Sequence, residues 1–233
     1  MKQFVFYGFI MIMLSSCMMR TGSGNIVTEK RQTGSFKGIS VGGAFEVDIK
    51  NGPETEVIVE SDDNIIKYIE TKVSGDVLKI RTKDGPGFSQ ATFKVHITSP
   101  EVNLIHVSGA SNVKATSQLK STGKISLDVS GAAGIKASLD APEIDSELSG
   151  AGNIELEGRT RDYKARVSGS GNLKSADLLS EHTNVSVSGA GTARVHASVS
   201  LKANASGAGN IHYKGGASVE QKTSGAGSIK SDN

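Results

Sequence analysis

A glycine-rich motif recurs seven times between residues 107 and 231, and it constrains the fold more than any other feature. The motif reads VSGASNVKA, VSGAAGIKA, LSGAGNIEL, VSGSGNLKS, VSGAGTARV, ASGAGNIHY and TSGAGSIKS. Its successive central glycines are 22, 19, 19, 20, 18 and 18 residues apart. A fixed period near twenty residues is the signature of a repeat architecture.

Apolar and small residues alternate with polar ones on both sides of each motif. In the second repeat, Ile125, Leu127 and Val129 precede the glycine, and Ile135 and Ala137 follow it. This spacing predicts two strands per repeat, each with one buried face. Because a single pair of strands cannot enclose that face, successive repeats must stack on one another.

The motif itself is predicted to form a corner that recurs at the same height on every coil. Glycine adopts positive φ at little steric cost, and asparagine tolerates the left-handed region. Stacked asparagines could also form a ladder of side-chain amides. The residues assigned to this structural turn are Gly109, Asn112, Gly131, Gly150, Asn153, Gly169, Asn172, Gly189, Gly207, Asn210 and Gly225.

Two architectures fit such a repeat: a parallel β-helix, and an antiparallel meander with a hairpin at each glycine turn. Equivalent residues recur with little drift, which favours the β-helix. The six-residue sub-period of left-handed β-helices is absent, which favours a right-handed one. We therefore expect an all-β, right-handed parallel solenoid with 18–22-residue coils over residues 101–233. Gln221 and Thr223 replace apolar residues in the last coil, as a cap against stacking would require.

Residues 28–100 are expected to form a less regular, β-rich part of the same domain. Residues 61–69 have the pattern of a capped short helix. Val41-Gly42-Gly43 and Val73-Ser74-Gly75 are weaker versions of the later motif, so this part could belong to the same stack.

The amino terminus has the pattern of a bacterial lipoprotein signal. Lys2 is followed by an apolar run from Phe4 to Leu14 and then by Leu14-Ser15-Ser16-Cys17, which resembles a lipobox. We expect residues 1–16 to be a signal peptide, Cys17 to be lipidated and residues 17–27 to form a tether. Met18 and Met19 provide no acidic retention signal, which favours anchoring to the outer membrane.

Composition excludes several other classes of protein. Lys and Arg total 26 against 24 Asp and Glu, so no basic excess indicates a nucleic-acid partner. With Cys17 as the single cysteine, neither disulfides nor a thiolate metal site can hold the fold. Only 5% of residues are aromatic, which predicts a narrow core of small aliphatic side chains.

Several segments together resemble a known family. The segment GSGNIVTEKRQTGSFKGISVGGAFEVDIKNG, then EVIVESDDNIIKYIETKV and the SGAGNI series, resemble the putative auto-transporter adhesin, head GIN domain family. Gly24-Asn25-Ile26 matches its opening motif, and Asp62-Asp63-Asn64 through Tyr68-Ile69-Glu70 matches an internal one. The resemblance covers nearly everything after the signal. It implies a right-handed single-stranded β-helix in the cell envelope and brings no catalytic residues.

No catalytic or cofactor motif stands out. The five histidines (His96, His106, His182, His196 and His212) share no metal-ligand spacing, and no nucleotide or hydrolase motif is present. We expect neither a metal nor a cofactor and no enzymatic activity. The alternative is a polysaccharide lyase or glycosidase, for which Asp128, Glu147 and Arg166 would stack on adjacent coils. Alternating surface charge explains the same three residues more simply.

A column of mostly basic residues five positions after each glycine is the candidate binding site. The candidate anion-binding residues in this column are Lys114, Lys136, Lys174, Arg194, His212 and Lys230, and the acidic Glu155 stands between Lys136 and Lys174. This basic column could attract anionic glycans or lipids, or it could keep the surface soluble. The sequence thus predicts a lipid-anchored, adhesin-like binding module, or else a self-associating scaffold that forms homo-oligomers.

Overall fold

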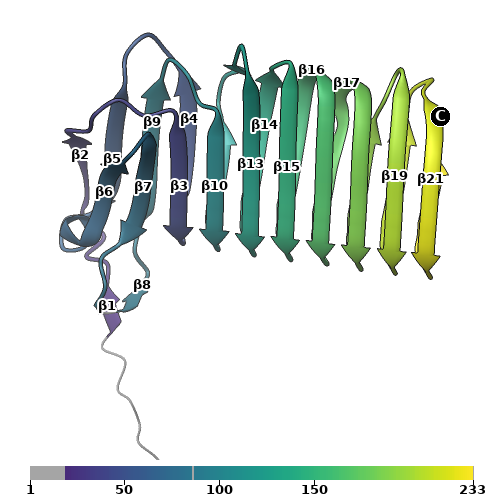
Figure 1. The fold of residues 1–233 in the computed structure, drawn as a ribbon. Helices are drawn as coiled ribbons and strands as arrows, with labels where there is room; N and C mark the ends of the chain where they lie inside the picture. The colour runs from purple at the N-terminus through teal and green to yellow at the C-terminus, as the bar shows by residue number, and fades with distance from the viewer. Residues whose placement is uncertain (1–18, 86, 233) are drawn as a thin grey trace, which may run out of the picture.

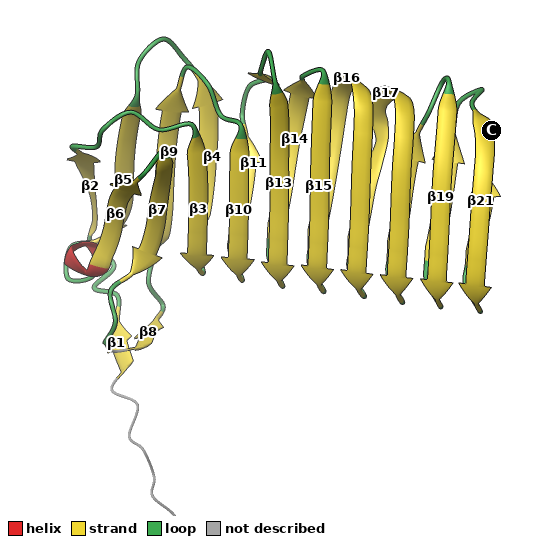
Figure 2. Cartoon of the chain, viewed as in Figure 1, coloured by secondary structure: helices red, strands yellow, loops and turns green. Residues whose placement is uncertain are grey.

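The computed structural model describes residues 19–85 and 87–232, and the chain in this range is mostly β-strand (Figures 1 and 2). Residues 1–18, which contain the predicted signal segment and Cys17, lie outside the described residues, as do residues 86 and 233.

Two parallel sheets lie face to face along the length of the molecule (Figure 1). The front sheet consists, in spatial order, of β7 (Val77–Thr82), β3 (Gly38–Gly43), β10 (Leu104–Gly109), β13 (Lys124–Gly131), β15 (Glu143–Gly150), the ends of β16 (Asn153–Gly169) and β17 (Asn172–Gly189), β19 (Ser200–Gly207) and β21 (Ser218–Gly225). The back sheet consists of β9 (Phe93–Ser99), β4 (Glu46–Asn51), β11 (Asn112–Ala115), β14 (Gly134–Asp140), the beginnings of β16 and β17, β18 (Thr192–His196), β20 (Asn210–Lys214) and β22 (Ser228–Ser231).

The repeats form a parallel solenoid, which confirms the predicted fold and rules out the antiparallel meander for them. Each repeat descends in the front sheet, turns at its glycine corner and ascends in the back sheet before the next coil (Figure 1). This path advances as a right-handed helix. Residues one repeat apart pair in register, for example Ile125 with Ile144 and Ile144 with Tyr163.

The amino-terminal part belongs to the same stack, but its coils do not follow chain order. The coil β3–β4 lies between β7 and β9 on one side and β10 and β11 on the other. Antiparallel strands cover this end: β6 (Ile69–Ser74) pairs with β7, and β5 (Glu56–Asp62) joins β9 to β2 (Ile26–Arg31). Shorter elements complete the fold, namely β1 (Met19–Thr21), β8 (Gly87–Ser89), β12 (Leu119–Lys120) and a 3₁₀ turn, η1 (Ile66–Tyr68).

The local predictions hold there only in part. Val41-Gly42-Gly43 does form a corner, with Gly43 paired to Gly109. Val73-Ser74-Gly75 forms no such corner: it lies in the β6–β7 hairpin, which agrees with the strand or hairpin expected from residues 73–80. The predicted short helix is only the single turn η1, and no side chain caps it. The local sequence at residues 73–75 and 61–69 could not show which distant strands these segments pair with, and that pairing decides their structure.

The glycine corners stack so closely that a side chain has no room. Gly150 has φ of +112°, and a Cβ atom there would lie 2.5 Å from the carbonyl oxygen of Gly131. The same oxygen accepts a hydrogen bond of 2.9 Å from the amide of Ala151. Equivalent bonds of 2.8–2.9 Å join each later corner to the one before it. Glycine is therefore required by both the dihedral angle and the close approach.

The predicted asparagine ladder is only partly formed. Asn172 donates to Asn153 over 3.3 Å, but Gly134 separates Asn112 from Asn153, and Thr192 separates Asn172 from Asn210. The column therefore contributes little beyond shaping each turn.

The core is narrow, as the composition predicts, and consists mainly of Val, Ile, Leu and Ala. Tyr163 is a large exception; its hydroxyl lies 2.9 Å from Ser146 Oγ, and burial raises the pKa of Tyr163 to about 12. The aromatic rings gather instead at the amino-terminal end, where Phe93 packs edge-on against Phe45 and Phe88.

Replacing Gly150 with alanine should destabilise the stack, because the methyl group would collide with the preceding carbonyl and the residue would hold an unfavourable φ. We expect Gly150→Ala to lower the free energy of unfolding by at least about 2 kcal/mol, measured by denaturant titration. Gly123→Ala is the matched control, since a Cβ atom there meets nothing within 4 Å. Equal stability of the two variants would contradict the close stacking of the corners.

Candidate functional site

The basic column is a real feature of the back sheet. Its residues pair in register across the strands in the order Lys114, Lys136, Glu155, Lys174, Arg194, His212 and Lys230. Except for the half-buried His212, all of them are exposed. Adjacent members are about 4.8 Å apart along the stack, the usual spacing of neighbouring strands.

Acidic side chains neutralise part of this column. Glu155 accepts a hydrogen bond from Lys136, which raises the pKa of Lys136 and lowers that of Glu155. At the far end, Asp232 lies 2.9 Å from His212 Nδ1, and this bond lowers the pKa of Asp232. At the near end, Lys114 pairs in register with Asp48. The basic column is therefore of mixed charge over its first half.

The most basic part of the column lies around Lys174 and Arg194. Within residues 19–85 and 87–232, neither side chain forms an ion pair. Together with Lys214, they line a hollow of about 350 Å³ on the back sheet, whose acidic lining residues are Glu155, Glu157 and Asp177. Lys136, which is bonded to Glu155, also lines this hollow, so four cations and three acids surround it. Sequence reasoning missed Lys214 because it lies outside the repeated position.

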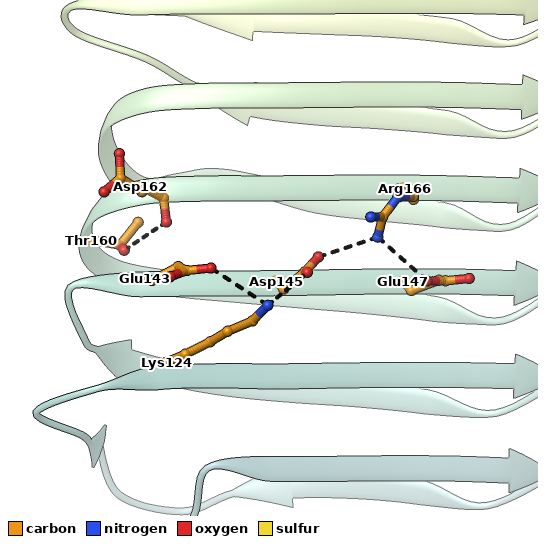
Figure 3. Close-up of polar contacts among 7 residues, drawn as sticks. All are labelled: Lys124, Glu143, Asp145, Glu147, Thr160, Asp162 and Arg166. Atoms are coloured by element: carbon orange, nitrogen blue, oxygen red, sulfur yellow. Dashed lines mark hydrogen bonds and ion pairs between the residues drawn. The ribbon is translucent and has the colours of Figure 1, made fainter.

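The acidic residues of the front sheet form a charge network rather than an isolated pair (Figure 3). Arg166 Nη1 lies 3.5 Å from both Asp145 Oδ1 and Glu147 Oε2. Lys124 Nζ lies 3.0 Å from Asp145 Oδ2 and 3.5 Å from Glu143 Oε1. The hydrogen bond to Asp145 raises the pKa of Lys124.

Asp145, which the repeat pattern did not single out, is the centre of this network. Its side chain is only 19% exposed, and its Oδ1 atom makes no hydrogen bond within the described residues, although Arg166 lies within ion-pair range. Lys124 and Arg166 thus flank Asp145 from the coils on either side, as expected of surface charges that balance one another. Asp128, Glu147 and Arg166 do stack on adjacent coils, as predicted.

Among the described residues, no hydrogen bond or ion pair joins one histidine to another. His96 lies between Asp48 and Glu60, at 3.4 and 3.6 Å, and His182 Nδ1 lies 2.8 Å from Ser200 Oγ. In the described part of the chain, no three His, Cys, Asp or Glu side chains are placed to hold a metal ion.

A polar latch fixes the start of the described chain to the amino-terminal end of the solenoid. The buried carboxylate of Asp62 accepts hydrogen bonds from the backbone amides of Gly24 (2.7 Å) and Thr92 (2.8 Å). Asp63 accepts from Ser23 Oγ (2.6 Å) and Asn25 Nδ2 (2.9 Å). Strand β1, which precedes the latch, pairs in parallel with β8.

The latch shows that residues 19–25, predicted to be part of a tether, are held against the domain. The two segments that meet, GSGN and SDDN, are those that carry the family resemblance, so the sequence did contain a signal for this contact. It could not show that the two segments bond to each other, because 38 residues separate Gly24 from Asp62.

Acid should weaken the latch. Backbone hydrogen bonds from Thr92 and Gly24 lower the pKa of Asp62, so its contribution to stability is complete above its unfolded pKa of about 3.9 and is lost as the pH falls through the lower folded value. We expect Asp62→Asn to flatten the fall in melting temperature below about pH 4.

Asp177→Asn is the control for this prediction, because the exposed Asp177 side chain makes no hydrogen bond to any described residue. A wild-type acid dependence that persists in Asp62→Asn but disappears in Asp177→Asn would contradict the role of the latch.

Comparison with known proteins identifies the family. The family model described as putative auto-transporter adhesin, head GIN domain, matches residues 35–217. The chain belongs to this family. The match confirms the resemblance found in the sequence, and the described solenoid coincides with it except for the last coil.

Solved structures share the fold over nearly their whole length. A putative adhesin from Bacteroides fragilis has a TM-score of 0.85 at 23% identity, covering 91% of this chain and 99% of that one. A putative lipid binding protein from Parabacteroides distasonis has a TM-score of 0.76 at 21% identity, covering 92% and 100%. A putative adhesin from the same organism has a TM-score of 0.76 at 26% identity, covering 91% and 99%.

No curated protein gives a significant match. The family and these structures are described as adhesins or as lipid binding, not as enzymes. An adhesin-like family is consistent with a place in the cell envelope or at its surface. Within the described residues, no helix has the length and apolar character needed to cross a bilayer.

Proposed function

We propose that this protein is a lipid-anchored envelope module that binds anionic glycans or lipids through the back sheet of its solenoid. The observation that carries the proposal is the convergence of Lys174, Arg194 and Lys214 on one hollow, from three different strands. Cations held at fixed spacing on a rigid sheet attract a polyanion through summed charge and lose little conformational entropy on binding.

The repeated geometry also favours weak contacts that add together. A polymer with regularly spaced carboxylates or sulfates could contact Lys174, Arg194 and further cations of the column at once. Each additional contact is then effectively intramolecular, so the total affinity exceeds that of any one contact. The family's description as adhesins supports this mode of action, as does the description of one structural relative as lipid binding.

Charge reversal in the hollow should weaken binding. We expect the triple variant Lys174→Glu, Arg194→Glu, Lys214→Glu to lose at least about tenfold in affinity, since each cation near an anionic surface contributes about 1 kcal/mol. Binding is measured to vesicles of phosphatidylglycerol, with phosphatidylcholine as a blank, and to immobilised polygalacturonate. All proteins carry Cys17→Ala, so that lipidation contributes nothing.

The control makes the same change in net charge elsewhere: Lys50→Glu, Lys79→Glu, Lys164→Glu. These three side chains are exposed and form no ion pair within the described residues. Binding to one probe alone would identify the ligand class. Binding that is equal in both triple variants, or absent in the parent protein, would refute the proposed site.

The lipid anchor is tested separately. Cys17→Ala should move the full-length protein from the membrane fraction to the soluble fraction and change its mobility on a gel, because no diacylglyceryl group would be attached. If both properties stay the same, the anchor and the outer-membrane location both lose their basis.

A further inference from the structure

The two ends of the solenoid differ in how they are covered. At the amino-terminal end, the antiparallel strands β2, β5 and β6 cover the first coil. At the other end, every residue of β21 is exposed, and β21 pairs only with β19 within the described residues. Figure 1 shows β21 as the outermost strand of the front sheet. The last coil begins at Ser218, just beyond the part of the chain that matches the family model.

Hydrogen bonds show which backbone groups of β21 face the open edge. The amides of Ser218 and Ala226 donate to Val199 and Gly207 of the preceding coil, at 3.0 and 2.8 Å. Successive residues of a strand direct their N–H and C=O groups to opposite sides. Val219, Gln221 and Thr223 therefore present theirs to the open edge, as a template for another strand.

The charges of β21 match those of a second, antiparallel β21. When two copies pair about Gln221, Glu220 of each lies opposite Lys222 of the other, at the non-hydrogen-bonded positions where side chains approach most closely. The residues between and beside them, Val219, Gln221 and Thr223, exchange the backbone hydrogen bonds. The edge is thus self-complementary in both charge and hydrogen bonding.

Strand β22, which closes the same coil on the back sheet, has matching features. Lys230 and Asp232 are exposed and two residues apart, like Glu220 and Lys222. Gln221 precedes the corner glycine Gly225 by four residues, and the midpoint between Lys230 and Asp232 follows Gly227 by four. A single twofold axis can therefore set Lys230 of each copy opposite Asp232 of the other, although Asp232 also lies 2.9 Å from His212 Nδ1 of its own chain.

We propose that the β21–β22 edge binds the same edge of a second copy of this chain, antiparallel and centred on Gln221. The product is a closed tail-to-tail dimer, since an isologous contact uses the edge of both partners. The contact is small, two short strands from each copy, and the dimer is accordingly weak and dependent on concentration.

In this dimer, the partner of the adhesin-like module is a second copy of the same chain. What the dimer does at the membrane rests on the lipid anchor proposed above. Strands β1 and β21 lie at opposite ends of the molecule (Figure 1). Two chains joined at β21 have their β1 strands at the two far ends of a continuous solenoid. Anchors at those ends would lie in two separate membranes, so the contact joins membranes and does not pair proteins within one membrane.

Paired charge variants test the dimer. The full-length protein in detergent micelles is compared by sedimentation equilibrium over a range of concentrations as wild type, Glu220→Lys, Lys222→Glu and an equimolar mixture of the two variants. Each variant alone sets like charges opposite each other twice, and its dimer should dissociate about tenfold more readily than that of the wild type. In the mixture, the substituted position of each variant faces the substituted position of the other. Opposite charges then meet again, and dimers should return.

The expected pattern is a monomer–dimer equilibrium for the wild type, mainly monomer for each variant and recovery in the mixture. Lys164→Glu, on the same sheet but away from the edge, should dimerise like the wild type. Glu220 also lies 3.4 Å from Lys202, so circular dichroism must first show that all variants are folded.

A wild type that stays monomeric at every concentration would overturn the proposal, as would a mass that grows without limit, which indicates head-to-tail stacking. Failure of the mixture to recover would overturn the register about Gln221. These results are independent of the anion-binding test, because Lys174, Arg194 and Lys214 do not lie on the edge strands and the dimer requires no ligand.

Discussion

The structure depends on the close contact between successive glycine corners. At each one, the carbonyl oxygen of the glycine below occupies the space that a Cβ atom would need, and it accepts the next amide above. This contact fixes the relative height of every coil. Once the height is fixed, the front and back strands pair in register, apolar side chains enter a common core, and outward residues align in columns. A loose corner would permit slips of register that move every side chain to the wrong face.

The part of the fold that repeats could be predicted from the sequence, and the part that does not repeat could not. Beyond residue 100, equal intervals between glycines and a period of two in hydrophobicity specify the coils, their faces and their corners. Before residue 100, the coil β3–β4 is inserted between strands that come later in the chain. Alternation in β5 or β6 shows that these segments are strands but says nothing about whether their neighbours run parallel or antiparallel. Only long-range pairing decides that.

The candidate site, too, could be predicted from the sequence only in part. Period and alternation placed Lys114, Lys136, Lys174 and Arg194 in one outward column, because residues one repeat apart must be neighbours in space. The sequence could not show that Lys136 is bound by Glu155 while Lys174 and Arg194 remain without ion pairs among the described residues, since this depends on side-chain conformation. Nor could it place Lys214 beside them, because that residue follows a different position of the repeat. A column of identical charge would repel itself, so interruption by acids stabilises the stack.

The two ends of the solenoid differ in charge and polarity, and this difference suits different roles. The latch at Asp62 holds the incoming chain at the end that is capped by antiparallel strands, so an anchor attached just before Met19 would keep that end at the membrane. The opposite end carries an uncovered edge in which each charge has its complement two residues away. An exposed edge is a hazard that proteins usually suppress with bulges, prolines or charged side chains. Residues 218–225 contain no proline and pair with β19 without a bulge, and their two charges, on Glu220 and Lys222, are of opposite sign, which favours one antiparallel register over others. Retaining such an edge is reasonable where contact between copies is itself the function.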